Sequence, residues 1–463
     1  MNILNAGAPR FVVPLSITYV PMKDSPHVDI VAAKVRSGSL TVEDYARSLL
    51  SRIKERDDAV KAWAYLNPEQ VLEQARQLDQ VPLEKRGPLH GVSVAVKDVI
   101  HTKDMPTQHN SAIYEGSHAG VDAGSIMILR NAGALILGKT TTTEFAATVD
   151  GPVTHNPHDP DRTPGGSSSG SGAAVADMQA AVGLGTQTGG STIRPGSYNG
   201  IYAFKPTWNS ITREGQKVFS LILDTLGLYA RTVEDMELLA DVFALQDDEP
   251  PYAATGGQFT VKGAKFAFMK TMVWKDNVQP STEVAMRKAA ELLKAHGAEV
   301  EEVELPDDLN ELPDWHQIVF KEDGRTAFLP EFRAARDQLH EQLVGHVENV
   351  HKHTHAQHMQ AFDSIAAARP RVDALLSKYA GVLTPSVPGE APIGIKSTGS
   401  AAFQLIWTAL HVPIVNIPGF AGENGMPVGI SLVTPRYHDR RLLAICKEVG
   451  KIFEEEGGWK SQL

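Results

Sequence analysis

Residues 181–190 have the sequence AVGLGTQTGG, in which a short apolar run passes directly into glycines and hydroxyl-bearing residues. Two similar runs precede it along the chain, GVSVAVKDVI at 91–100 and GALILGKT at 133–140. Short apolar runs bounded by glycine are typical of strands in a sheet that is covered on both faces. The three runs therefore predict buried strands of such a sheet.

Further along the chain, residues 265–305 predict a strand–helix–strand unit. KFAFMK at 265–270 predicts a strand, Val284 to Leu293 a helix that ends at Gly297, and AEVEEVEL at 298–305 another strand. This order is typical of an α/β protein with parallel pairing.

The rest of the chain extends this pattern at both ends. A helix is expected from Thr41, its capping residue, and a second helix over 68–79. Residues 306–380 are expected to be mostly helical, and the stretches from 381 to 433 return to strands and turns. Without an internal repeat or a long linker, one domain over 1–463 is expected. Its parts are an N-terminal helical region (1–80), a core (81–245), a variable and mostly helical pocket region (246–379) and a C-terminal part of the core (380–463).

Composition limits the classes of function. The 463 residues are 42% hydrophobic and 21% charged, with a net charge of −11, which disfavours nucleic acid as a partner. The one cysteine, Cys446, fits a reducing compartment, so a cytoplasmic protein is expected. The apolar stretch at residues 11–21 is broken by two prolines, so neither a signal peptide nor a membrane span is expected.

GALILGKT also matches the phosphate-loop pattern G-x-x-x-x-G-K-[ST]. In a phosphate loop the intervening residues wrap an anion after a strand has ended. Here they are Ala134, Leu135, Ile136 and Leu137, which are themselves the predicted strand. We therefore reject nucleotide binding at this motif.

Two other features can carry chemistry. GGSSSGSG at 165–172 has the composition of a flexible linker, but a run of small apolar residues typical of a closely packed helix follows it directly. The N–H groups at such a helix start are suited to bind developing negative charge. Lys97 ends an apolar run; it is either a solvated strand tip or, if buried, a base with a lowered pKa.

Taken together, these motifs resemble the amidase signature family. GGSSSG at 165–170, GTQTGGS at 185–191 and FKPT at 204–207 match its signature in order. Further matches are PLHGVSVAVKD, GALILGKTTTTEFA, ARTVED, VLTPSVPGEAP and GMPVGISL, so the resemblance covers roughly residues 30–245 and 380–450. It implies an α/β fold whose central mixed, mostly parallel sheet is covered by helices on both faces.

The resemblance implies a Ser–cis-Ser–Lys triad without a metal or other cofactor. Ser191 is the implied nucleophile, Ser167 the bridging serine in a cis peptide, and Lys97 the base. A serine hydroxyl needs a neighbouring group to remove its proton, which neutral Lys97 can do through Ser167. Backbone N–H groups of Thr188, Gly189, Gly190 and Ser191 can converge on one oxygen as an oxyanion hole, because glycine permits close approach.

Two positions depart from the common family pattern. Arg194 is the third residue after Ser191 rather than the second, as in a malonamidase-like branch. There it can bind a substrate carboxylate; the alternative is that it pairs with a buried acid and braces the loop. Gln187 stands where an acidic residue is common, which removes a charge near the site.

Histidines and aromatic residues gather in the variable region. Residues 340–358 hold six histidines, of which His351 and His355 can share a helix face and bind a metal. A solvated, partly helical surface is the preferred interpretation. A further set of aromatic residues falls where family members line the acyl pocket, although core packing explains them equally well. The set comprises Trp315, Phe320, Phe328, Phe332 and Trp407.

The expected function is hydrolysis of a small amide, or of a carbamate or urea, through an acyl-enzyme. One alternative is the A subunit of a tRNA-dependent amidotransferase, which predicts partner subunits and glutaminase activity. The other is a binding protein on an inactive amidase scaffold. The expected partner is the small-molecule substrate, without nucleic acid or membrane, and a homodimer stays an open alternative.

Overall fold

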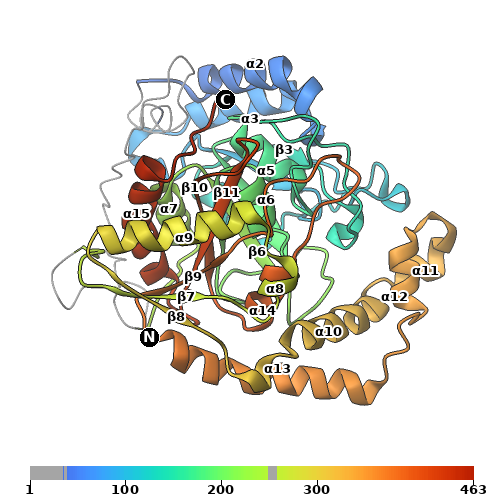
Figure 1. Ribbon diagram of the computed structural model, residues 1–463. Coiled ribbons are helices and arrows are strands. Elements are labelled where there is room, and N and C mark those ends of the chain that lie inside the picture. Colours follow the sequence, from blue (N-terminus) through green and yellow to red (C-terminus); the bar gives the residue numbers. More distant parts are fainter. Residues whose placement is uncertain (1–34, 36–38, 249–257) are drawn as a thin grey trace, which may run out of the picture.

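The computed structural model describes residue 35, residues 39–248 and residues 258–463, and within them one 11-stranded sheet forms the centre of the molecule (Figure 1). The strands are β1 Trp63–Leu66, β2 Ser93–Lys97, β3 Leu135–Thr140, β4 Val182–Gln187, β5 Tyr202–Lys205, β6 Thr225–Ala230, β7 Lys265–Met269, β8 Glu299–Val303, β9 Gly381–Pro385, β10 Ile414–Ala421 and β11 Pro427–Val433. The predicted runs at 91–100, 133–140 and 181–190 are the adjacent strands β2, β3 and β4.

The strand order is β1-β3-β2-β4-β6-β5-β10-β11-β9-β7-β8. Pairing is parallel within β3-β2-β4 and within β9-β7-β8, and antiparallel between the other neighbours. The predicted mixed sheet is confirmed. Parallel pairing is nevertheless less extensive than the sequence predicts, because short connections such as residues 422–426 can join only antiparallel neighbours.

Helices cover the sheet on both faces. They are α2 Val42–Val60, α3 Pro68–Asp79, α4 Gly124–Asn131, α5 Ser169–Ala176, α6 Ile193–Tyr198, α7 Val233–Val242, α8 Trp274–Asn277, α9 Pro280–Ala295, α10 Leu312–Ala327, α11 Leu329–Ala335, α12 Glu341–Val347, α13 His355–Leu376, α14 Ala402–Ala409 and α15 Asp439–Glu456. Helices α10 to α13, gold to orange in Figure 1, lie together along one side of the molecule.

The two faces of the sheet belong to different core clusters. Phe266 and Phe268 of β7 pack in one cluster with residues of α7, α9 and α15. Ala267 and Met269 of the same strand pack in the other, with residues of α6, α10, α13 and α14. This alternation is the period of two expected of a strand that is buried on both faces.

Several local predictions are confirmed. Thr41 caps α2, its hydroxyl accepting the Asp44 N–H at 3.0 Å, and α3 spans the predicted 68–79. Gly297 follows α9 with a φ of +86°, a left-handed conformation that glycine adopts without strain. The stretch at residues 11–21 lies outside the described residues.

The phosphate-loop match at 133–140 is strand β3, which agrees with its rejection. Lys139, the lysine of the match, is fully buried, and its Nζ lies 3.3 Å from Asp98 Oδ1 and 2.7 Å from Thr107 Oγ1. Its amine is therefore engaged inside the protein. Among the described helices, none is long and apolar enough to cross a membrane.

Candidate active site

The candidate site forms where β2 and β4 end. These two strands are parallel neighbours, so Lys97, the last residue of β2, and Thr186, near the end of β4, lie at the same edge. Helix α5 packs against both strands, and the turn before it carries Ser167 and Ser168. Residues far apart in the sequence are thereby brought together.

The Lys97 amine lies among three hydroxyl groups. Its Nζ is 2.7 Å from Ser167 Oγ, 3.0 Å from Ser168 Oγ and 2.7 Å from Thr186 Oγ1. No carboxylate of the described residues hydrogen-bonds it. Lys97 is 0% exposed, which settles the alternative left open by the sequence: it is a buried amine and not a solvated strand tip.

Burial lowers the pKa of Lys97 well below its usual value, because the charged form loses its hydration. The negative charge of Asp224 opposes this effect, and the positive charge of Arg194 adds to it. Burial therefore shifts Lys97 toward the neutral amine, the form whose lone pair can accept a proton.

Ser167 and Ser191 differ in exposure. The Gly166–Ser167 peptide bond is cis, as the resemblance implies, and Ser167 is buried, with Lys97 as its hydrogen-bond partner. Ser191 lies in the turn between β4 and α6 and is partly exposed, so its hydroxyl can meet a ligand from outside. Its carbonyl accepts a hydrogen bond from the Tyr229 hydroxyl at 3.2 Å.

Asp224 holds the segment before Ser191 in place through hydrogen bonds. Its carboxylate accepts the Thr188 hydroxyl at 2.7 Å and the Phe219 N–H at 2.7 Å. Burial raises the pKa of Asp224 to about 6, although these hydrogen bonds favour its charged form. Thr188 is therefore held through its side chain, while Gly189 and Gly190 follow it without side chains of their own.

Arg194 binds two backbone carbonyls. Its Nε and Nη2 donate to the Gly166 carbonyl at 3.0 and 2.6 Å, and its Nη1 donates to the Gly399 carbonyl at 2.5 Å. Among the described residues it has no carboxylate partner, so the expected pairing with a buried acid is wrong. The guanidinium holds the carbonyl of the residue before Ser167, and burial lowers its pKa to about 10.

The histidines singled out from the sequence are not on one helix face. His355 begins α13, and His351 lies in the turn before it. Within the described part of the chain, no group of three or more histidine, cysteine or acidic side chains is arranged to hold a metal.

The aromatic residues separate into two groups. Trp407 is fully buried in the second core cluster, and Trp315 packs at its border. Phe328, with Phe320 and Phe332 beside it, packs around Phe145 in a small cluster between α10–α12 and the segment after β3. Core packing accounts for Trp407, which the sequence left undecided.

Sequence reasoning missed several neighbours of the site. Ser168 and Thr186 lie inside the quoted motifs, so their hydroxyls were visible as candidates. His316 of α10 donates its Nε2–H to the Thr188 carbonyl at 2.8 Å, and Thr408 of α14 donates to the Gly189 carbonyl at 2.6 Å. Neither of these two residues lies in a motif that pointed to the site.

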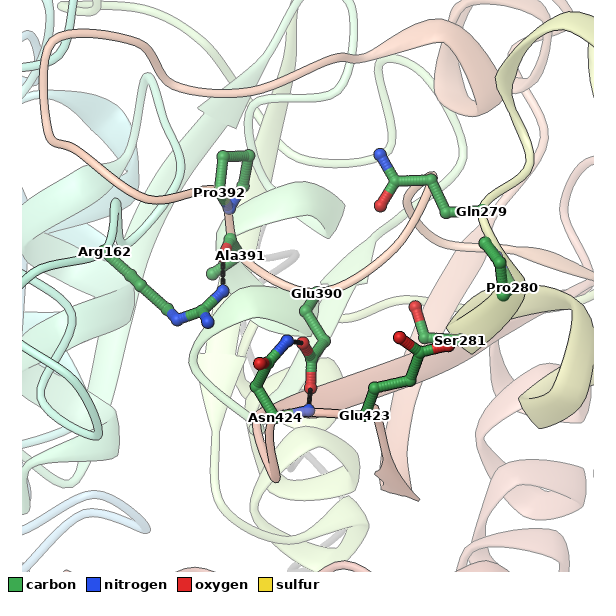
Figure 2. Close-up of a pocket in the computed structure, with 9 residues that line it drawn as sticks. All are labelled: Arg162, Gln279, Pro280, Ser281, Glu390, Ala391, Pro392, Glu423 and Asn424. Carbon is green, nitrogen blue, oxygen red and sulfur yellow. Dashed lines mark hydrogen bonds between the residues drawn. The ribbon is translucent and has the colours of Figure 1, made fainter.

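A separate surface hollow lies at the start of α9 (Figure 2). Its walls include Arg162, Ser281 and Glu390, and none of the lysine and serine residues described above. The Glu390 carboxylate already accepts hydrogen bonds from Asn424 Nδ2 at 2.6 Å and from the Asn424 N–H at 3.0 Å. The hollow is therefore separate from the candidate active site.

Comparison with known proteins shows which family and which solved structures this chain is similar to. The family model described as Amidase matches residues 44–443. The chain is 31% identical over 480 residues to the A subunit of the glutamyl-tRNA(Gln) amidotransferase of Symbiobacterium thermophilum, covering 91% of this chain and 97% of that protein. A crystal structure of an amidase is 26% identical with a TM-score of 0.80, covering 92% of this chain and all of that one. The fold is also that of the native peptide amidase from Stenotrophomonas maltophilia, with a TM-score of 0.75, 24% identity, and coverage of 94% and 97% of the two chains.

Proposed function

This chain belongs to the amidase signature family and is a hydrolase of carbon–nitrogen bonds other than peptide bonds, and we propose that it cleaves a small amide through an acyl-enzyme on Ser191. The observation that carries the proposal is the 2.7 Å contact between Lys97 Nζ and Ser167 Oγ in a fully buried setting. Burial favours the neutral amine, which is the form that a base requires.

The hydroxyls around Lys97 support a direction for proton transfer. A neutral amine has two N–H groups and one lone pair. Ser168 directs its own proton to the Thr186 carbonyl at 3.3 Å, so Ser168 accepts from Lys97. If Thr186 accepts the second N–H, the lone pair is left for the Ser167 proton. Ser168 and Thr186 thus orient the base toward Ser167.

The proposed reaction begins when Ser191 Oγ attacks the substrate carbonyl carbon. The Ser191 proton passes to Ser167 Oγ as the Ser167 proton passes to Lys97 Nζ. Backbone N–H groups of residues 188–191 stabilise the oxyanion of the tetrahedral intermediate, each contributing roughly 3–4 kcal/mol. The C–N bond then breaks, and the proton returns through Ser167 to the leaving nitrogen. Water then attacks the carbonyl carbon of the acyl-enzyme and gives its proton to the same relay. The bond to Ser191 Oγ breaks, Ser191 regains a proton, and the acid is released.

Arg194 acts in this proposal as a brace. Three of its N–H groups are taken by the Gly166 and Gly399 carbonyls, which leaves its fork poorly placed for bidentate binding of a substrate carboxylate. The alternative role, as a carboxylate anchor, predicts a preference for substrates such as malonamate.

Hydrolysis of a small panel by the purified protein tests the proposal, with Ser191→Ala as the blank. The panel holds an aryl anilide, an aliphatic amide, an aryl carbamate, malonamate and glutamine. Release of ammonia or amine from one of the first four, absent in Ser191→Ala, is the expected result. No turnover of any of them would overturn the proposal.

Glutamine belongs in the panel because of the second candidate function. The relative from Symbiobacterium thermophilum is named as one of the subunits of an amidotransferase, and it matches nearly the whole chain. Glutaminase activity alone, rising when partner subunits are added, would favour that candidate. A cytoplasmic location, suggested by the single cysteine, and a homodimer both stay predictions.

A further inference from the structure

Three successive carbonyl groups beside Ser191 are each held by a different part of the protein. The Thr188 carbonyl accepts from His316 Nε2 at 2.8 Å, and the Gly189 carbonyl accepts from Thr408 Oγ1 at 2.6 Å. The Gly190 carbonyl accepts from the Arg194 N–H at 3.0 Å. Helices α10 and α14 and the first turn of α6 thus each fix one peptide plane.

Fixing a carbonyl also fixes the N–H of the next residue. The peptide unit is planar, and in its trans form the C=O and the following N–H point in opposite directions. Each held carbonyl therefore directs the N–H of the next residue, Gly189, Gly190 or Ser191, away from the donor that holds it. None of these three N–H groups has a hydrogen-bond partner among the described residues, as donors reserved for a ligand oxygen require.

Thr408 is itself oriented by Gln187. The Gln187 Oε1 accepts the N–H groups of Thr192 and Ile193 at 2.9 and 3.1 Å, which fixes which end of the amide is oxygen. Its Nε2 therefore faces Thr408 Oγ1 and donates to it at 3.0 Å. With one lone pair so occupied, the Thr408 hydroxyl directs its proton to the Gly189 carbonyl.

We infer that Thr408 and Gln187 are positioning residues for the oxyanion hole: through the Gly189 carbonyl they aim the Gly190 N–H at the oxygen of the substrate. The inference rests on the proposed function, because the oxygen exists only if Ser191 attacks a carbonyl. Both side chains are buried, at 1% and 0% exposure, so the link is shielded from water. Neither touches the reacting atoms.

This arrangement gives a reason for the amide at position 187. A carboxylate of the same shape can accept the Thr192 and Ile193 N–H groups, but it has no N–H for Thr408. The Thr408 hydroxyl then donates to the carboxylate and releases the Gly189 carbonyl. Glutamine and threonine therefore act as a matched pair in this chain.

The test compares Thr408→Val, Thr408→Ser and Gln187→Glu with wild type on whichever panel substrate is turned over. Loss of the hydroxyl in Thr408→Val is expected to lower kcat by roughly 10- to 100-fold, less than the loss of a whole donor, with KM within about threefold, since the loss falls on the transition state. Thr408→Ser keeps the hydroxyl and restores kcat to within about threefold. Thr282→Val is the matched control, because Thr282 is also buried and donates to a carbonyl, that of Val387 at 3.1 Å, outside the site.

A second readout separates positioning from packing. A peptide-like aldehyde matched to the substrate forms a tetrahedral adduct on Ser191, and its inhibition constant is expected to rise in Thr408→Val and Gln187→Glu by the same factor as kcat/KM falls. The double variant is expected to lose no more than Thr408→Val, because both changes break one link.

The outcomes are distinct. Unchanged kcat in Thr408→Val and Gln187→Glu, failure of Thr408→Ser to keep kcat near the wild-type value, or an equal loss in Thr282→Val would overturn the inference while the proposed function stands. No turnover by wild type would remove the proposed function and this inference together.

Discussion

Lys97 gives the proposed chemistry a pH signature. Burial lowers its pKa, so the neutral, active amine increases as pH rises through that lowered pKa, and kcat/KM rises with it. Lys97→Ala is expected to lose about 100- to 10,000-fold in kcat and the rising limb with it. Rates measured from pH 5 to 9 on both proteins check this. Activity of Lys97→Ala within tenfold of wild type would exclude it as the base.

A substitution at Arg194 distinguishes the two roles that the sequence left open, a brace for the loop and an anchor for a substrate carboxylate. Arg194→Lys keeps the charge but not the planar fork that spans the Gly166 and Gly399 carbonyls. As a brace, it is expected to lower kcat for neutral and carboxylate-bearing substrates by the same factor. Measuring kcat and KM of wild type and Arg194→Lys for malonamate and a neutral amide checks this. A rise in KM confined to malonamate would instead identify a carboxylate anchor.

Helix α5 is built from small residues because the turn before it must place Ser167 and Ser168 close to two strands. A Cβ on Gly170 would lie 2.2 Å from the Ala62 carbonyl oxygen and 2.5 Å from the Thr141 nitrogen. Gly170→Ala is therefore expected to lower the free energy of unfolding by about 1–3 kcal/mol, measured by urea denaturation.

Gly345→Ala on α12 is the matched control for this change. Its Cβ would meet only the Val350 side chain, at 3.3 Å, and Val350 is exposed and can move. Alanine is favoured there by about 0.5–1 kcal/mol. Equal stability of the two variants would show that the packing around Gly170 is not tight.

Elements with strong local signals were predictable from the sequence, and those without were not. Helix α3 and strands β2 to β4 have capping residues, glycine boundaries or apolar runs that identify them. The two polar residues of helix α14, Gln404 and Thr408, are buried with its apolar residues, so the helix lacks the exposed polar face that reveals a helix by its periodicity. Thr408 therefore could not be placed near Gly189, which lies 219 residues earlier.

For the molecule as a whole, the motif order identified Lys97, Ser167 and Ser191 as candidates for catalysis, but it did not reveal the strand directions. Parallel pairing was overestimated because it depends on which strands become neighbours, and most neighbours in the C-terminal half of the core are not consecutive in sequence. The sequence pattern could not show this. The contact between Arg194 and the Gly399 carbonyl, which belongs to a distant loop, was likewise not visible in the sequence.

Buried lysines give the fold a predictable dependence on pH. Lys205 is fully buried, donating to the Val412 carbonyl at 2.6 Å, and burial lowers its pKa to about 7. Between pH 7 and the unfolded value of about 10.4, the unfolded state binds more protons than the folded state at this residue. Its contribution to the free energy of unfolding therefore rises with pH in this window.

Lys205→Met is expected to flatten that rise. Urea denaturation of wild type and variant at pH 7, 8 and 9 measures the difference, in which the other titrating groups cancel. The stability of wild type relative to the variant should increase at each step. A difference that stays constant or falls with pH would mean that Lys205 is charged in the folded protein.

The most direct test of the account is the mass of the protein during turnover. Mixing the enzyme with an activated aryl ester of an acid from the preferred amide, followed by acid quench, should trap one acyl group per chain on the peptide that contains Ser191. Ser191→Ala should carry none, and Lys97→Ala should acylate far more slowly. An acyl group on another residue, or steady turnover with no acyl group on Ser191 at any time, would contradict the proposed mechanism.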